Sequence, residues 1–227
     1  MKKKEVYLVK LMTSYNSALP SILLDYVSSE CRNKIGKVRK IIDQKNHLYA
    51  EIISRLFGSK ILNVKYEQLQ IERGKYGKPY FRREKLCFNI SHTSNIIIVS
   101  FSLFPIGIDI EKVQKVNDLI INKFFTKLEK EYIYADSLYT DERFTEIWTK
   151  KEAYIKYLGH YLNTSLNKID TTKKNISKKM ISFNKDGYIL SIFRKKIIKD
   201  YQEYHLNEMD LIELFEQDIF DKVDMIK

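Results

Sequence analysis

The chain has little of the material from which linkers and covalent cross-links are made. Of its 227 residues only 7 are glycine and 3 are proline, which leaves no stretch able to act as a flexible linker. The two cysteines, Cys31 and Cys87, provide neither a disulfide framework nor a metal-binding spacing, and this fits a reducing compartment. Hydrophobic residues make up 44% of the chain, so we expect a globular protein with a sizeable core.

Membrane and targeting segments are also missing. No apolar run reaches the length needed to span a membrane. The basic residues 2–4 resemble the start of a signal peptide, but Glu5 and Lys10 interrupt the short apolar stretch that follows them. We therefore expect a cytoplasmic protein that has no membrane partner.

Positive charge is what the chain has in excess. Its formal net charge is +11, and residues 206–227 contain seven acidic residues and two lysines, so the rest of the chain carries +16. A body with this charge suits a polyanionic partner, such as a nucleic acid, a phosphate-rich cofactor or an acidic protein.

Residues 105–112 alternate strictly and predict a β-strand, with three isoleucines on one face and Gly107, Asp109 and Glu111 on the other. Residues two apart on a strand are separated by about 6.5 Å, so the two carboxylates stand side by side. The preceding residues 96–101 predict a strand buried on both faces, which places the acids near a core. Such a pair favours a raised pKa or a bound cation, and oxygen ligands favour a hard ion such as Mg²⁺. Two solvated acids on an exposed face explain this segment equally well.

A third acid lies in the helix predicted for residues 141–159. Glu152 follows Trp148 by four residues and precedes Ile155 by three, so it projects close to the apolar stripe. A carboxylate is seldom placed there without a partner. Lys156 has the i+4 spacing of an ordinary surface pair, which explains the lysine but not an inward-facing Glu152. The acids of the strand and of the helix could therefore converge on one cation.

Other polar motifs lie between these segments. Lys78 lies in a Gly-Lys-Pro turn, where it is either solvated or presented to an anion. The segment after it predicts a short strand that ends in a loop, in which His92 lies among hydroxyl groups that suit a phosphate. No nucleophile-elbow glycines surround Ser91, which argues against a serine hydrolase. Thr126 and Glu129 have the spacing of a capping box, which by itself explains Glu129 structurally.

The remaining periodicities predict the rest of the core. Residues 21–57 carry helical periodicity in two segments, the second with Asp43 as its N-cap and Gly58 as its stop. The basic side chains where this second helix begins could hold phosphates, but by default they are expected to face solvent: Arg32, Lys34, Lys37, Arg39, Lys40 and Lys45. Further elements are expected as follows: a strand over residues 5–12, a hairpin over 181–193 with an Asp-Gly turn, a strand over 201–206, and a closing acidic amphipathic helix.

Taken in order, these motifs resemble the 4′-phosphopantetheinyl transferase superfamily, and within it the larger, monomeric surfactin-synthetase-activating type. The motifs are Gly77-Lys78-Pro79, Phe88-Asn89-Ile90-Ser91-His92, Gly107-Ile108-Asp109-Ile110-Glu111, Phe124-Phe125-Thr126 with Glu129, and Trp148-Thr149-Lys150-Lys151-Glu152-Ala153-Tyr154-Ile155-Lys156. The resemblance implies an α/β (α+β) fold of two similar halves related by a pseudo-twofold axis. These halves would be residues 1–104 and residues 105–227, and the second would carry the metal site.

The resemblance also implies a reaction. A serine hydroxyl of an apo acyl or peptidyl carrier protein would attack the pyrophosphate of coenzyme A, which would lie in the cleft between the halves. The 4′-phosphopantetheine group would be transferred, and 3′,5′-ADP would leave. The carrier, an acidic protein, would meet the basic body of a monomer, and nucleic acid is not expected as a partner.

Roles for single residues follow from the same resemblance. They are Asp109, Glu111 and Glu152 as ligands of Mg²⁺ (or Mn²⁺), Lys156 beside the phosphates, Lys78, Ser91 and His92 as coenzyme A contacts, and Glu152 or Glu129 as general base. The chain departs from the family pattern at the 3′-phosphate of coenzyme A. Lys34 matches one basic position, but Cys31 stands where a lysine is expected and Asn46 where an arginine is expected. Nearby basic residues could substitute, namely Lys37, Arg39 and Lys45.

Two other classes of function are compatible with parts of this pattern. A metal-dependent nuclease would use the acids and the basic body, but many such enzymes need a lysine two residues after the glutamate. Here Lys112 follows Glu111 directly and points to the other face of the strand. A non-catalytic module that binds nucleic acid or a carrier protein explains the charge but leaves Glu152 unexplained.

Overall fold

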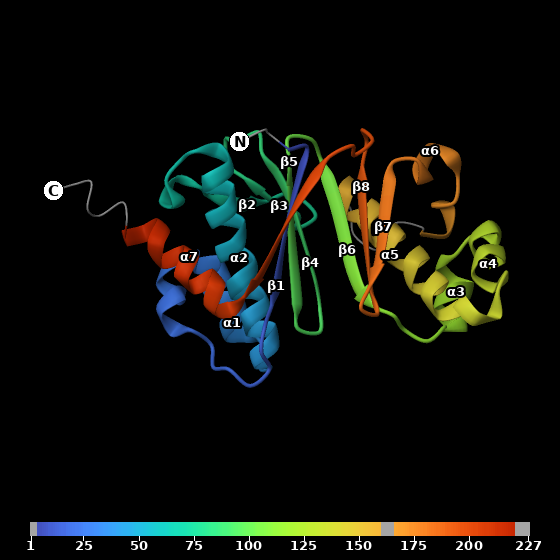
Figure 1. The fold of residues 1–227 in the computed structure, drawn as a ribbon, viewed down its shortest axis with the longest axis horizontal. Helices are drawn as coiled ribbons and strands as arrows, with labels where there is room; N and C mark the ends of the chain where they lie inside the picture. Colours follow the sequence, from blue (N-terminus) through green and yellow to red (C-terminus); the bar gives the residue numbers. More distant parts are fainter. Residues whose placement is uncertain (1–3, 160–165, 221–227) are drawn as a thin grey trace.

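The computed structural model describes residues 4–159 and 166–220 (Figure 1). Its helices and strands, with η for a 3₁₀ helix, are β1 (Val6–Met12), η1 (Ser21–Tyr26), α1 (Ser29–Lys37), α2 (Ile41–Leu62), η2 (Tyr66–Gln68), β2 (Ile71–Arg73), β3 (Pro79–Phe81), β4 (Cys87–Thr93), β5 (Ile96–Ser102), β6 (Ile106–Lys112), α3 (Asp118–Phe124), α4 (Lys127–Tyr134), η3 (Ser137–Tyr139), α5 (Thr140–Leu158), η4 (Leu166–Lys168), α6 (Lys174–Ser177), β7 (Met180–Lys185), β8 (Tyr188–Arg194), β9 (Tyr201–Asn207) and α7 (Glu208–Phe220). None of the described helices is both long and apolar enough to cross a membrane.

The strands form two main sheets that share one plan. The first sheet has the order β4-β5-β1-β9, with β1 antiparallel to β5 and parallel to β9. The second has the order β6-β8-β7 and is antiparallel throughout. Each half follows the order strand, helix, hairpin, and the hairpin pairs with the strand to form the sheet. These elements are β1, α2 and β4–β5 in the first half, and β6, α5 and β7–β8 in the second. The expected mixed α/β fold is confirmed, and the repeated plan makes the two halves similar.

Helices cover the outer faces of both sheets, and the sheets meet between them (Figure 1). Residues of β1 that face outward, such as Val9, pack in one core with Leu48 of α2 and Phe215 of α7. Residues that face inward, such as Leu8 of β1 and Ile108 of β6, share a second core between the sheets. The alternation of residues 105–112 therefore predicted correctly which face of β6 is apolar.

Most of the predicted strands are confirmed. The strand over residues 96–101 is β5, and every residue of it is buried. The hairpin over 181–193 is β7 and β8, and its turn residues Asp186 and Gly187 have φ of 55° and 75°, as a two-residue hairpin turn requires. The strand over 201–206 is β9, and it pairs with β1.

The C-terminal segment returns to the first half of the molecule. β9 extends the first sheet, and α7 places Leu211 and Phe215 in its core. Phe215 packs edge-on against Tyr26 and Tyr66, with ring centroids 4.9 and 5.3 Å away. A division of the chain at residue 104 therefore does not follow the sheets, because residues after 200 belong with the first sheet.

Two expectations about α2 were wrong. The helix begins at Ile41 with Lys40 as its N-cap, so Asp43 lies inside the first turn, and it continues through Gly58 to end before Asn63, whose φ is 55°. Gly58 serves packing instead of termination, because a Cβ there would lie 2.7 Å from Cζ of Phe81.

Lys45 was also expected to face solvent, and this prediction is wrong. Its side chain is fully buried and its Nζ donates hydrogen bonds to the Ser14 carbonyl at 2.7 Å, to the Ser17 hydroxyl and to Glu208 Oε1 at 3.0 Å. A charge that leaves water needs a full set of partners, and Glu208 at the start of α7 supplies the opposite charge. Lys45 therefore ties α7 to α2 and is not available to a phosphate.

Gly107 sets the distance between β6 and α5. A Cβ at this position would lie 2.0 Å from the Ala153 carbonyl oxygen and 2.4 Å from the Tyr157 nitrogen. Both atoms belong to helix backbone and cannot rotate away. The absence of a side chain lets the strand approach the helix closely, and this brings the acids of β6 beside Glu152.

We predict that Gly107→Ala destabilises the protein, because the helix must move off the strand. The expected loss is about 1–3 kcal/mol of the free energy of unfolding, measured by urea denaturation. Gly36→Ala in α1 is the matched control, since nothing lies within 4 Å of a Cβ there, and it should be neutral or stabilise by up to about 1 kcal/mol. A Gly107→Ala variant as stable as the wild type would contradict this account of the strand–helix contact.

Candidate active site

A cavity of about 630 Å³ lies between the two halves, bounded by α1, α2, the β2–β3 turn, β4, β6 and the C-terminal part of α5. Eight of the residues singled out from the sequence line it: Lys34, Lys78, Ser91, His92, Asp109, Glu111, Glu152 and Lys156. Residues more than 100 positions apart are thus brought together, whereas Glu129 is not part of the described lining.

Four acidic residues line the cavity, and three of them, Asp109, Glu111 and Glu152, lie together in a poorly solvated group, whereas Glu51 lies on α2. Asp109 and Glu152 are 4% and 9% exposed. Burial, followed by the charge of Asp109, raises the pKa of Glu152 to about 7. The same two causes raise the pKa of Glu111. Like charges that share a dry place disfavour ionisation of each other, as the strand pattern predicted.

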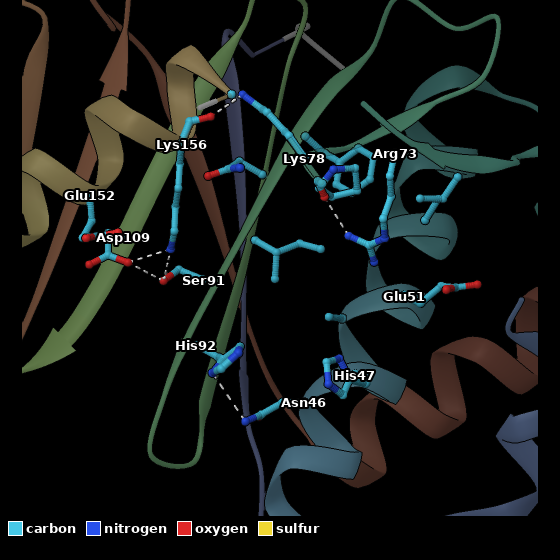
Figure 2. A pocket seen from close by; sticks show the side chains of 18 of the residues that line it. Asn46, His47, Glu51, Arg73, Lys78, Ser91, His92, Asp109, Glu152 and Lys156 are labelled. Carbon is cyan, nitrogen blue, oxygen red and sulfur yellow. Dashed lines mark hydrogen bonds and ion pairs between the residues drawn. The ribbon is translucent and has the colours of Figure 1, made fainter. Parts of the chain in front are cut away.

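Lys156 and Ser91 hold one oxygen of Asp109 (Figure 2). The Lys156 Nζ lies 2.7 Å from Asp109 Oδ1 and 3.0 Å from Ser91 Oγ, and the Ser91 hydroxyl donates to the same Oδ1 at 2.8 Å. The lysine therefore supplies the positive charge that the buried carboxylate needs. It reaches Asp109 from α5, one turn after Glu152.

The oxygen atoms of this cluster fit a hard cation in kind and in charge. Asp109 Oδ2 and Glu152 Oε1 are buried and have no hydrogen-bond partner among the described residues. Buried carboxylate oxygens are normally satisfied, so two such atoms in one cavity point to a missing positive partner. The ligand set is not preassembled, since within the described part of the chain no three acidic, histidine or cysteine side chains are grouped to hold a metal.

His92 lies on strand β4 and not in a loop, which corrects the sequence expectation. Its side chain faces α2, on the side of the strand opposite Ser91, and its Nδ1 lies 3.5 Å from the Asn46 amide nitrogen (Figure 2). Burial and then the charge of Lys156 lower the pKa of His92, so its ring is neutral at pH 7. The imidazole can therefore donate one hydrogen bond to a ligand without adding charge.

Lys78 reaches from the first half to the second at the end of the cavity next to α5. Its Nζ donates to the backbone carbonyls of Ile106 at 3.1 Å, Lys156 at 2.6 Å and Tyr157 at 3.2 Å. The last two carbonyls belong to the final turn of α5, where a cation is favourable. Burial lowers the pKa of Lys78 to about 8. In this structure the lysine is thus neither solvated nor free in the cavity.

A basic rim lies at the end of the cavity formed by α1, α2 and β2. Lys34 and Arg73 both contact Glu30 Oε1, at 2.5 Å each, and His47 lines the cavity beside them. Burial and then the charges of Lys34 and Arg73 lower the pKa of His47. Sequence reasoning missed Arg73 and His47, although Arg73 precedes the Gly-Lys-Pro turn and donates to its Gly77 carbonyl at 2.9 Å.

The positions that depart from the family pattern also line this end of the cavity. Cys31 and Asn46 both face it, but burial raises the pKa of the Cys31 thiol to about 12, so it provides no charge for an anion. Lys45 is buried elsewhere, as described above. Of the basic residues proposed as substitutes, the described cavity lining includes neither Lys37 nor Arg39.

Glu129 is fully buried away from the cavity and has a complete set of partners. Its Oε2 accepts from the Thr126 backbone at 2.9 Å and pairs with Lys151 Nζ at 2.7 Å, and its Oε1 accepts two bonds from Thr171 at 2.9 Å. The predicted capping box is confirmed. Lys151 also donates to the carbonyls of Leu166 and Ile169. The geometry does not support Glu129 as a general base, because no oxygen of it reaches the cavity.

Comparison with known proteins identifies the family to which the chain belongs. A model of the 4′-phosphopantetheinyl transferase superfamily matches residues 105–207, and a model of the 4′-phosphopantetheinyl transferase N-terminal region matches residues 17–102. The chain is 27% identical to 4′-phosphopantetheinyl transferase gsp of Aneurinibacillus migulanus over 201 residues, 87% of this chain and 83% of that protein. It is 30% identical to 4′-phosphopantetheinyl transferase Sfp of Bacillus subtilis strain 168 over 150 residues, 63% and 65% of the two chains.

The chain therefore belongs to the 4′-phosphopantetheinyl transferase superfamily and is an enzyme of that class. A more distant relative, the L-aminoadipate-semialdehyde dehydrogenase-phosphopantetheinyl transferase of Mus musculus, is 26% identical over 160 residues, 63% of this chain and 52% of that protein. The resemblance stated from the motifs is confirmed. Neither the nuclease nor the non-catalytic module gains support from these comparisons.

We predict that Glu129 can be replaced if its partner is replaced with it. Glu129→Gln alone leaves the Lys151 charge buried without compensation, and it should lower the free energy of unfolding by about 3–5 kcal/mol in urea denaturation. The double variant Glu129→Gln/Lys151→Met removes both charges at similar volume, so it should regain most of that stability together with transferase activity. A double variant that is folded but inactive would instead show that Glu129 takes part in the chemistry.

Proposed function

We propose that the protein transfers 4′-phosphopantetheine from coenzyme A to a serine of an apo acyl or peptidyl carrier protein and releases 3′,5′-ADP. The observation that supports this most directly is the convergence of Asp109, Glu111 and Glu152 with Lys156 in one cavity between the halves. Two of the acids present buried oxygens without partners, and a basic rim lies at the far end of the same cavity. An acidic end and a basic end suit a bound cation together with an elongated anion.

In this proposal Asp109, Glu111 and Glu152 hold Mg²⁺, or Mn²⁺ in its place. When bound, the ion supplies positive charge to the pyrophosphate of coenzyme A and to the negative charge that builds on the leaving group. The protein contributes carboxylates fixed on a strand and a helix whose separation Gly107 sets. Their positions are therefore determined by the packing of β6 against α5 and do not depend on flexible loops.

Lys156 and Glu152 divide the proton chemistry. Lys156 Nζ lies beside the acids, and from there its ammonium can stabilise the phosphates and protonate the departing oxygen. Glu152 is the carboxylate that can accept the proton of the carrier serine, because it lines the cavity whereas Glu129 is enclosed elsewhere. The geometry therefore supports Glu152 over Glu129 as the general base.

The remaining cavity residues orient the coenzyme. Lys34, Arg73 and His47 form the basic rim, and we assign to them the 3′-phosphate of coenzyme A. Ser91 and His92 contact the ligand from the two faces of β4, and Lys78 lies at the end of the cavity next to α5. The +16 body outside the acidic C-terminal segment suits an acidic carrier protein.

The proposal is tested by incubating the protein with coenzyme A, Mg²⁺ and several apo carrier proteins. Mass spectrometry should show a phosphopantetheine adduct on the carrier serine. No adduct should form when a chelator is present from the start of the reaction. Asp109→Ala should lower the rate by at least about 100-fold, because a fixed charge beside the phosphates is lost. The exposed Asp25→Ala is the matched control and should retain the wild-type rate. The proposal fails if no carrier that an active transferase modifies gains the adduct.

Arg73 gives a second test, which addresses the coenzyme. Arg73→Ala should lower kcat/KM for coenzyme A by about 10- to 100-fold, since a hydrogen-bonded charge pair with the 3′-phosphate is lost. The same variant should lose little with 3′-dephospho-coenzyme A, which lacks that phosphate. Arg82→Ala, an exposed arginine near the same hairpin, is the control. Equal losses with both coenzymes would remove Arg73 from the 3′-phosphate site.

A further inference from the structure

Three side chains on one face of β4 contact β6 along the line where the halves join. They are Asn89, Ser91 and Thr93, two residues apart, and their partners on β6 follow the same period. β6 pairs with β8 on its other side, so this row of side chains meets the edge of β6 that has no neighbouring strand in its own sheet. Polar side chains here take the place of a backbone ladder.

The first two members of the row satisfy backbone groups. Asn89 Oδ1 accepts from the Ile108 N–H at 2.8 Å, and Ser91 Oγ accepts from the Ile110 N–H at 3.2 Å. A buried N–H without a partner is costly, so these two residues have a sufficient structural reason. Ser91 also touches Asp109 and Lys156 in the cavity.

Thr93 differs from both. Its hydroxyl donates to Glu111 Oε2 at 2.9 Å, which is a side chain and not a backbone group. Among the described residues, the other donor to the Glu111 carboxylate is the side chain of Gln114, 3.4 Å from the same Oε2. Two donors to one oxygen restrict the rotation of the carboxylate and leave Oε1 without a hydrogen bond to a described residue. Thr93 itself is not part of the described cavity lining.

Glu111 has more need of such a partner than its neighbours. Asp109 has a shorter side chain and is held by Ser91 and Lys156, whereas Glu111 has one more rotatable bond and lies at the partly exposed end of β6. A freely rotating carboxylate loses side-chain entropy when it binds an ion. A donor that already fixes it lowers this cost, and partners of this kind change metal affinity by about 10- to 100-fold in other proteins.

We propose that Thr93 is a positioning residue that holds Glu111 in the orientation in which it binds a divalent cation. The inference rests on the proposed function, since it concerns the ion that Asp109, Glu111 and Glu152 would hold. Because Thr93 belongs to the first half and Glu111 to the second, the contact also makes cation binding sensitive to the correct docking of the halves.

The test measures metal binding directly, without turnover. Mn²⁺ is titrated into the protein saturated with coenzyme A, in the absence of carrier, and is followed by electron paramagnetic resonance and by calorimetry. Thr93→Val keeps the shape and β-branching of the side chain and removes the hydroxyl, so the Kd for Mn²⁺ should rise by about 10- to 100-fold. Thr93→Ser keeps the hydroxyl and should stay within about threefold of the wild type, well below that range.

Thr13→Val is the matched control. It makes the same chemical change at a residue whose hydroxyl donates to a backbone carbonyl, that of Asn95 at 3.2 Å, and not to a carboxylate. It should leave the Kd for Mn²⁺ unchanged, and the thermal midpoints of all three variants should lie within about 2–4 °C of the wild type.

The outcomes separate the inference from the proposed function. If the wild type binds Mn²⁺ and Thr93→Val binds it equally well, the positioning role of Thr93 is wrong while the metal site stands. If the Kd rises in Thr93→Ser as much as in Thr93→Val, the hydroxyl is not the cause and the inference is overturned. If the wild type with coenzyme A binds no Mn²⁺, the metal part of the proposed function fails, and the inference fails with it.

Discussion

The close packing of β6 against α5 at Gly107 is the constraint on which the site depends. With helix backbone 2.0 Å from where a Cβ would be, no other residue lets the strand and helix meet at this distance. The contact brings carboxylates from both elements into one poorly solvated space, where burial and then the charge of Asp109 raise the pKa of Glu111 and of Glu152. Lys156 then neutralises Asp109 from the same helix. The cluster stores unfavourable electrostatic energy that the surrounding fold must outweigh, which is a common cost of a functional site.

The two halves share a plan but not this chemistry. At the strand positions where β6 has Gly107, Asp109 and Glu111, β1 has Tyr7, Val9 and Leu11, and the last two pack against α2 in an ordinary apolar core. The first half instead contributes β4, whose alternating polar side chains close the open edge of β6. The second half therefore supplies the acids. The first half supplies the strand whose side chains hold two of them in place and partly exclude water.

Patterns within one element were predictable from the sequence, and contacts between distant elements were not. The faces of β6 and the inward position of Glu152 follow from periods of two and of 3.6 residues, and the capping box follows from the spacing of Thr126 and Glu129. The burial of Lys45 depends on Glu208, 163 residues away, which reaches it only because β9 returns to β1. Arg73 likewise enters the site through the path of the β2–β3 hairpin. The order of the motifs identified Asp109 and Lys156, but no local pattern indicates that Lys45 is buried or that Arg73 lies in the site.

The state of Lys156 explains why cation and coenzyme should bind together. In this structure its ammonium is committed to Asp109 and Ser91, and Lys78 is committed to backbone carbonyls. A phosphate that draws Lys156 away leaves Asp109 charged and buried, which is costly unless a second positive charge takes over the carboxylate. In the proposed function, a cation at the acids would therefore free the lysine for the phosphates, and the phosphates would favour the cation in return, because coupling between two ligands is reciprocal. Thr93 contributes to the same coupling. If it already orients Glu111, less side-chain entropy is lost when the cation binds, so Lys156 is released more easily.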